Sequence, residues 1–138
     1  MAGFLFNAGG HGLLSGDIDW SSDTIRARLV LSSDTPDKDA TAMTGIGVTG
    51  NDQTLGTKTG PTKDDSGDRV TYGAANATFG SQSAGGEVNK VVIFKFVTDD
   101  AGSTPIACVD IDAVTPNGGD ITVAWAGGLT FALNNQPA

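Results

Sequence analysis

The stretch that decides the fold is VNKVVIFKFV, residues Val88–Val97, a run of β-branched and aromatic side chains with glycines before it and an Asp-Asp-Ala-Gly segment after it. This composition between turn signals predicts a strand rather than a helix. Side chains alternate along a strand, which places Val92 and Phe94 on one face and Val91 and Ile93 on the other. Because both faces are apolar, we expect a central strand that is covered on both sides.

The composition around this run favours a β protein. The chain has 138 residues, enough for one domain with its own core over residues 1–138. Its hydrophobic content of 38% and charged content of 17% are low for a globular protein, and 20 glycines fill part of the difference. Glycine-rich turns between short apolar runs are typical of antiparallel sheets and argue against a helical bundle.

Further runs with period-two alternation lie on both sides of the central strand. We predict an all-β fold, an antiparallel β-sandwich or barrel of six to seven strands, with a short N-terminal helical segment over residues 3–16. Residues 103–105 are expected to form a turn because they include Pro105, and the tail after residue 133 is expected to be loose. The other expected strands are residues 24–31, 69–79 with a break near Gly73, 106–111, 121–125 and 129–133.

Several single residues are expected in the core. Ile18, Trp20 and Trp125 lie in segments that we expect to be buried, as does the only cysteine, Cys108. One cysteine excludes an internal disulfide, and Cys108 is expected to be a small core residue. The first residues lack a basic region followed by a long apolar stretch, so we expect no secretion signal and synthesis in a cytoplasm. No apolar run reaches the length of a membrane span.

Candidate catalytic and metal-binding residues are few. His11 is the only histidine, and nothing near it resembles a nucleophile motif, so neither a catalytic triad nor a zinc site is expected. Aspartates cluster at several turns, but the segment from Asp64 to Asp68 lacks the closing Glu of a calcium loop. Asp is also a common turn residue, and we favour a role in turns over calcium binding for these aspartates. We expect no enzyme activity, no cofactor and no metal.

The charge distribution limits the class of partner. The formal net charge is −8, and the 8 Lys and Arg residues are spread along the chain, so we expect no binding to nucleic acid or to an anionic membrane. Arg26 and Arg28 share one face of the strand at residues 24–31, which is either a solvated face or a contact to an acidic partner. Residues 51–68 are interpreted as a binding loop, a weakly patterned hairpin or an arm that a partner orders.

Four stretches carry a resemblance to a known family. FNAGGHGLLSGDIDW (residues 6–20) running into DTIRARLV (23–30), VVIFK (91–95) and VTPNGGDITVAW (114–125) resemble a small family of structural proteins of tailed bacteriophages and prophages. In that family a short N-terminal helix leads into an entry strand, and a Pro-Asn-Gly-Gly-Asp hairpin lies near the C-terminus. Over residues 40–67 the chain differs from that family. Members include head decoration proteins and tail-associated proteins.

This resemblance implies a virion component without enzyme activity. We expect a capsid decoration (cement) protein, made in the host cytoplasm, that binds the capsid exterior through the major capsid protein and forms a homo-oligomer such as a trimer. One alternative is a tail, collar or fibre-base component that forms rings. Another is a carbohydrate-binding or calcium-binding module, against which the missing export signal counts. The candidate contact residues are an N-terminal arm of Ala2, Gly3, Phe4, Leu5 and Phe6, and the two arginines Arg26 and Arg28.

Overall fold

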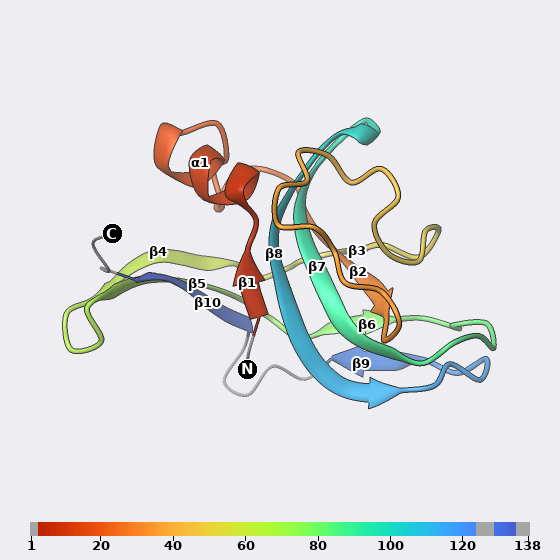
Figure 1. Ribbon diagram of the computed structural model, residues 1–138. Helices are drawn as coiled ribbons and strands as arrows, with labels where there is room; N and C mark the ends of the chain where they lie inside the picture. Colours follow the sequence, from red (N-terminus) through yellow and green to blue (C-terminus); the bar gives the residue numbers. More distant parts are fainter. Residues whose placement is uncertain (1–2, 124–128, 135–138) are drawn as a thin grey trace.

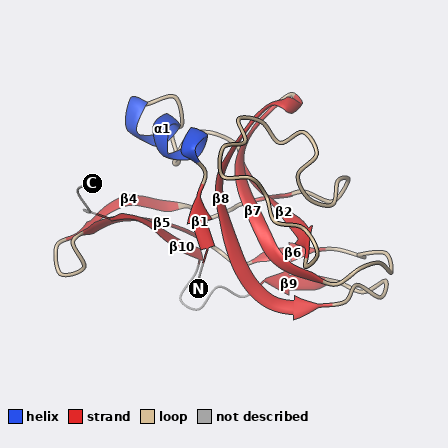
Figure 2. Ribbon diagram, viewed as in Figure 1, coloured by secondary structure: helices blue, strands red, loops and turns tan. Residues whose placement is uncertain are grey.

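The computed structural model describes residues 3–123 and the backbone of residues 129–134. It is an all-β fold with one short helix near the N-terminus, as expected (Figures 1 and 2). The described residues form more strands than the six or seven expected, because β1, β3 and β4 are too short or too weakly patterned to be recognised in the sequence. The elements in chain order are β1 (Gly3–Leu5), α1 (Asn7–Ser15), β2 (Ile25–Leu31), β3 (Gln53–Thr54), β4 (Thr59–Asp64), β5 (Arg69–Ala74), β6 (Ala77–Phe79), β7 (Val88–Val97), β8 (Asp99–Val114), β9 (Ile121–Val123) and β10 (Leu129–Asn134).

The main sheet is antiparallel, with the strand order β1-β8-β7-β2-β3. Strand β7 has the bounds expected from the sequence and lies at the centre of this sheet. Val91 and Ile93 belong to one cluster of buried side chains, and Val92 and Phe94 belong to a second cluster. The prediction of a central strand that is covered on both faces is therefore confirmed.

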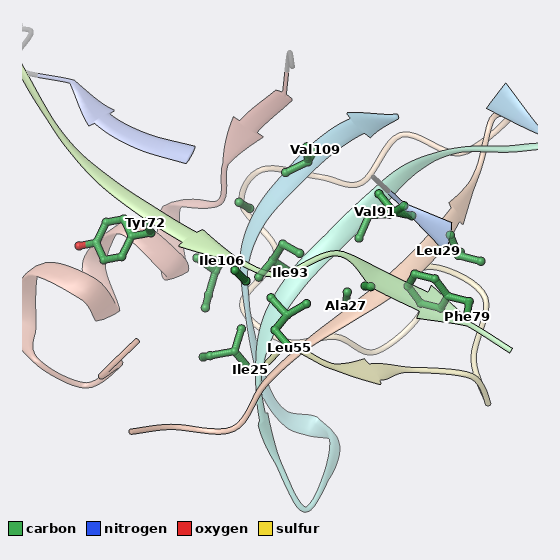
Figure 3. Packing of buried hydrophobic residues seen from close by; sticks show 14 of the residues in the cluster. Ile25, Ala27, Leu29, Leu55, Tyr72, Phe79, Val91, Ile93, Ile106 and Val109 are labelled. Carbon is green, nitrogen blue, oxygen red and sulfur yellow. The ribbon is translucent and has the colours of Figure 1, made fainter. Parts of the chain in front are cut away.

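One face of the main sheet packs against a second layer. This layer consists of the sheet β10-β5-β4 and the two-stranded sheet β6-β9. Tyr72 of β5 and Phe79 of β6 belong to the same cluster of buried side chains as Val91 and Ile93 of the main sheet, and Figure 3 shows Tyr72 on the side of Ile106 and Phe79 on the side of Leu29. The layers are joined at one side, where the N–H of Ala75 donates to the carbonyl of Gly56 at 3.0 Å. The larger core thus lies between the layers, as in the predicted sandwich or barrel.

The entry segment before β2 contributes to this core. Ile18 and Trp20 are buried, as expected. The indole N–H of Trp20 donates to the carbonyl of Gly73 at 3.1 Å, and its ring meets Tyr72 edge-on. A buried indole is stable when its N–H has such a partner. Trp125, the other expected core tryptophan, lies outside the described residues.

The second face of the main sheet is covered by residues 40–52, which we call the strap. Met43 and Ile46 of the strap are buried against the second cluster, next to Phe94. The N–H of Val48 donates to the carbonyl of Leu29 at 2.8 Å, which holds the strap along β2. A loop with two buried apolar side chains therefore replaces a third layer.

Strand β8 is longer than the predicted residues 106–111, and the expected turn at residues 103–105 is wrong. The chain reverses near Thr98 instead, since Val97 pairs with Asp99. Pairing then steps from Phe94–Pro105 to Ile93–Ala107, which leaves Ile106 as the extra residue of a β-bulge. Proline lacks an N–H and is tolerated within a sheet at such irregular positions.

Helix α1 docks on this bulge through glycines. It is shorter than the predicted residues 3–16, because Gly3–Leu5 pairs with β8 as strand β1. A Cβ on Gly9 would lie 2.4 Å from the Cα of Ile106, whereas a Cβ on Gly10 would meet nothing within 4 Å. The helix therefore approaches the sheet closely only because residue 9 has no side chain.

The two neighbouring glycines provide a matched test of this docking. We expect Gly9→Ala to lower the free energy of unfolding by about 1–3 kcal/mol, because the added methyl overlaps the backbone of Ile106. Gly10→Ala should raise it by up to about 1 kcal/mol, since alanine favours the helix and meets nothing. Urea unfolding of both variants measures the difference, and equal effects would contradict the close approach.

Candidate functional site

Arg26 and Arg28 lie on one face of β2, as expected, but their surroundings differ. Arg28 is directly opposite Val92 on β7, and Arg26 is opposite Phe94. Both side chains thus lie on the face that the strap covers. The structure makes Arg28 an internal anchor and leaves Arg26 without a hydrogen bond or ion pair to any described residue.

All five N–H donors of the Arg28 guanidinium are satisfied. Nε and Nη2 donate to the two oxygens of Asp52 at 2.7 and 2.8 Å. Nη1 and Nη2 donate to the two oxygens of Asp100 at 3.0 and 2.8 Å, and Nη1 also donates to the carbonyl of Ile46 at 3.0 Å. Two bidentate carboxylates are the geometry that a planar guanidinium fits best. Arg28 therefore ties β2 to the strap and to the start of β8.

Burial makes this cluster electrostatically strong. Arg28 is 3% exposed, while Asp100 is 34% exposed. The hydrogen bonds that Arg28 donates to Asp52 raise the pKa of Arg28, and those that it donates to Asp100 lower the pKa of Asp100. A buried pair of this kind is costly to break from one side, because the remaining charge has no partner. The cluster of Arg28, Asp52 and Asp100 therefore attaches the strap to the main sheet.

Arg26 has a different environment on the same face. Its guanidinium carbon lies 3.5 Å from the centre of the Phe96 ring, which is a close cation–π contact. Its Nε is buried and has no hydrogen-bond partner among the described residues. The side chain as a whole is half-buried, and Thr54 of β3 lies opposite it. Of the two predicted arginine contacts, only Arg26 reaches the surface with free donors.

The expected N-terminal arm is part of the fold. Gly3, Phe4 and Leu5 form β1 and pair with β8, and Phe6 is fully buried beneath the second face. Phe4 and Leu5 are half-buried, so part of each is accessible to a partner. Ala2 lies outside the described residues. The segment is therefore an edge strand that is anchored by Phe6, and its role as a partner contact stays a prediction.

Within residues 51–68, residues 59–68 form the first strand and the turn of a hairpin, which confirms that interpretation for this part, whereas residues 53–54 form β3 and pair with β2. Strand β4 pairs with β5, and no residue of β4 is buried. Figure 1 shows that this hairpin extends away from the main sheet. Its tip carries ion pairs between Arg69 and Asp64 and between Lys63 and Asp65, at 2.9 and 3.2 Å.

The groups considered for chemistry are placed as follows. His11 is exposed on α1. Cys108 is buried as expected, and burial raises the pKa of its thiol to about 11. Asp64 accepts hydrogen bonds from Ser66 and Arg69, which is turn chemistry. Within residues 3–123, no three His, Cys, Asp or Glu side chains are grouped so that they could hold a metal.

The Arg28 cluster was not recognised in the sequence. Its partners are 24 and 72 residues away in the chain. The only local signal is an arginine between two apolar residues of a strand that has apolar neighbours on both faces. That pattern raises the question of a buried partner, but it does not say which of many aspartates supplies it.

Comparisons with known proteins give no further guidance. No protein-family model, no curated protein and no solved structure matches this chain. Among the described residues, no helix is long and apolar enough to cross a membrane.

Removing Arg28 tests the role of the cluster. We expect Arg28→Met to lower the free energy of unfolding by about 3–5 kcal/mol, because two carboxylates then face each other without a cation. Lys63→Met also removes one positive charge, but from an exposed pair, so its effect should stay within about 1 kcal/mol. Chemical denaturation measures both changes. Similar losses in the two variants would show that Arg28 does not hold the strap.

The same cluster predicts a dependence of stability on pH. The pKa of Asp100 is lowered by Arg28 in the folded chain, so the unfolded chain binds more protons as pH falls. The free energy of unfolding of wild type should therefore exceed that of Asp100→Asn by its full amount at neutral pH, and this difference should shrink below about pH 3.8. Asp65→Asn removes an exposed carboxylate and serves as control. Thermal unfolding from pH 7 to pH 2 follows the difference, and a constant difference would rule out this linkage.

Proposed function

We propose that this protein is a bacteriophage virion structural protein, namely a capsid decoration (cement) protein that binds the outside of the head and bridges capsid subunits. The observation that carries the proposal is the likeness of residues 6–30, 91–95 and 114–125 to a family of tailed-phage structural proteins. The partner under this proposal is the major capsid protein, with a homo-oligomer such as a trimer as the bound form.

The residues of this likeness have defined structural roles. Residues 91–95 lie within β7, and Trp20 fills the larger core. In the Asn-Gly-Gly-Asp turn, Asp120 accepts a hydrogen bond from the N–H of Ser81 at 2.7 Å, and Gly118 donates to the carbonyl of Gln82 at 2.7 Å. The likeness therefore concerns residues that determine the fold, which supports a shared architecture with that family.

The surface of the domain suits attachment to an extended lattice. Edge strand β1 pairs, among the described residues, only with β8, so its other edge offers backbone groups for strand addition. The β4–β5 hairpin extends from the body at another place (Figure 1). Many copies that each make modest contacts at two places reinforce a shell through multivalency.

The copy number per particle tests this proposal. Quantitative mass spectrometry of purified virions should give one copy per major capsid subunit, or a simple fraction of it, because a decoration protein follows the symmetry of the shell. Absence from purified virions would contradict any role in the particle.

The same measurement separates the tail alternative from the head. A tail, collar or fibre-base component would be present in far fewer copies than the capsid subunit. Particles whose tails have been detached provide the control, since a decoration protein stays with the head fraction.

A further inference from the structure

The guanidinium of Arg26 differs from the other buried polar groups of the described chain in its hydrogen bonding. Its Nε is the one buried side-chain nitrogen or oxygen, among the described residues, without a hydrogen-bond partner. A buried donor without an acceptor costs free energy, and native proteins keep few of them. Departures from local packing rules are expected at functional sites. The terminal Nη atoms of Arg26 are not among these buried atoms and make no hydrogen bond to a described residue, so they are the donors that a partner can reach.

Arg28 provides an internal comparison. It lies on the same strand and the same face, and its donors are all satisfied by Asp52, Asp100 and the Ile46 carbonyl. Both oxygens of Asp52 and of Asp100 accept hydrogen bonds from Arg28, and neither aspartate is hydrogen-bonded to Arg26. The fold thus supplies acceptors to one arginine of the pair and leaves the other available.

We propose that Arg26, stacked on Phe96, receives a carboxylate side chain of the partner protein. Under the function proposed above, on which this inference rests, that carboxylate belongs to the major capsid protein. The close contact with the Phe96 ring, at 3.5 Å from ring centre to guanidinium carbon, fixes the cation before binding. Because Nε is buried, the terminal Nη atoms are the donors that remain for a ligand. A carboxylate matches two parallel N–H donors.

The charge of the chain favours this occupant over others. Binding to a nucleic acid requires several cations along a phosphate backbone, whereas this site offers one arginine on a chain of net charge −8. A single carboxylate needs only one guanidinium with two free donors, which this site provides.

Binding to heads tests this contact directly. The probe is the purified head of the same virus, assembled without this chain, to which the full-length protein is added. Arg26→Met should weaken binding about tenfold or more, as expected for a central contact. Arg26→Lys should bind with an affinity between those of wild type and Arg26→Met, because lysine keeps the charge but lacks the planar guanidinium. The salt dependence of affinity should be smaller for Arg26→Met than for wild type.

Lys90→Met is the matched control for charge. It removes one positive charge from the neighbouring strand β7, and its ammonium group donates to Asn89 and Ser32 within the chain. Its affinity for heads should stay within about twofold of wild type, because a screened charge outside a contact contributes little.

Stability separates a binding role from a structural one. Arg26→Met removes a buried donor that has no acceptor, but it also removes the cation–π contact with Phe96, so the two effects oppose each other and the variant should unfold at a denaturant concentration close to that of wild type. A clear loss of stability would show that Arg26 supports the fold and would overturn the inference.

The remaining outcomes are also decisive. Wild-type affinity in Arg26→Met overturns the contact while the decoration function stands, and wild-type affinity in Arg26→Lys overturns the bidentate geometry. If sedimentation shows that Arg26→Met changes the association of the free chain, the occupant is a second copy instead. Failure of the wild-type chain to bind heads overturns the proposed function and this inference together.

Discussion

The structure depends on a sheet that buries apolar side chains on both faces. A strand such as β7, with Val91 and Ile93 on one side and Val92 and Phe94 on the other, is stable in water only when each face is covered. The second layer covers one face with regular strands. The other face is covered by Phe6 and by the strap, which buries few apolar side chains of its own. Its attachment therefore relies on polar contacts, and the Arg28 cluster provides the strongest of them.

The way in which the strap covers the second face explains why Arg28 is paired with aspartates and Arg26 is not. An arginine that lies under a cover must be neutralised, because a buried and unpaired charge is expensive. Asp52 comes from the end of the strap and Asp100 from the start of β8, so the ion pairs form only when both segments are in place. Arg26 makes no hydrogen bond to these aspartates, and the contact described for its guanidinium is the cation–π contact with the Phe96 ring. A ring supports a guanidinium without satisfying its donors.

Local pattern was sufficient to predict the regular core. β7 has the predicted bounds, and β2 begins one residue later than expected. The predicted break near Gly73 falls slightly later in the chain, since Gly73 is paired within β5 and the gap before β6 is at residues 75–76. Alternation and turn residues are local signals, and these segments satisfy them without conflict. β4 has no apolar alternation, because no residue of it is buried, so its sequence pattern does not distinguish a strand from a loop. The apparent turn at Pro105 is a bulge, which depends on pairing with a strand elsewhere.

The candidate site was harder to predict for a related reason. Strand periodicity places Arg26 and Arg28 on one face, but the same pattern fits a solvated face, a buried ion pair and a partner contact. The distinction depends on aspartates that are distant in the chain and on the path of the strap. Likewise, the N-terminal residues resemble a free arm in sequence, and only the pairing of β1 with β8 shows that they are attached.

The proposed contact also explains how an acidic chain can bind an acidic spot on a capsid. Charges separated by more than about 8 Å are largely screened at physiological ionic strength, so the net charge of −8 acts weakly across a docked interface. The local charge at the point of contact then decides the interaction, and Arg26 presents a positive charge whose position is fixed by Phe96. Fixing it in advance reduces the entropy lost on binding. Under the proposed function, each copy in a shell would repeat the same contact, and a modest gain at one arginine would be multiplied over the whole particle.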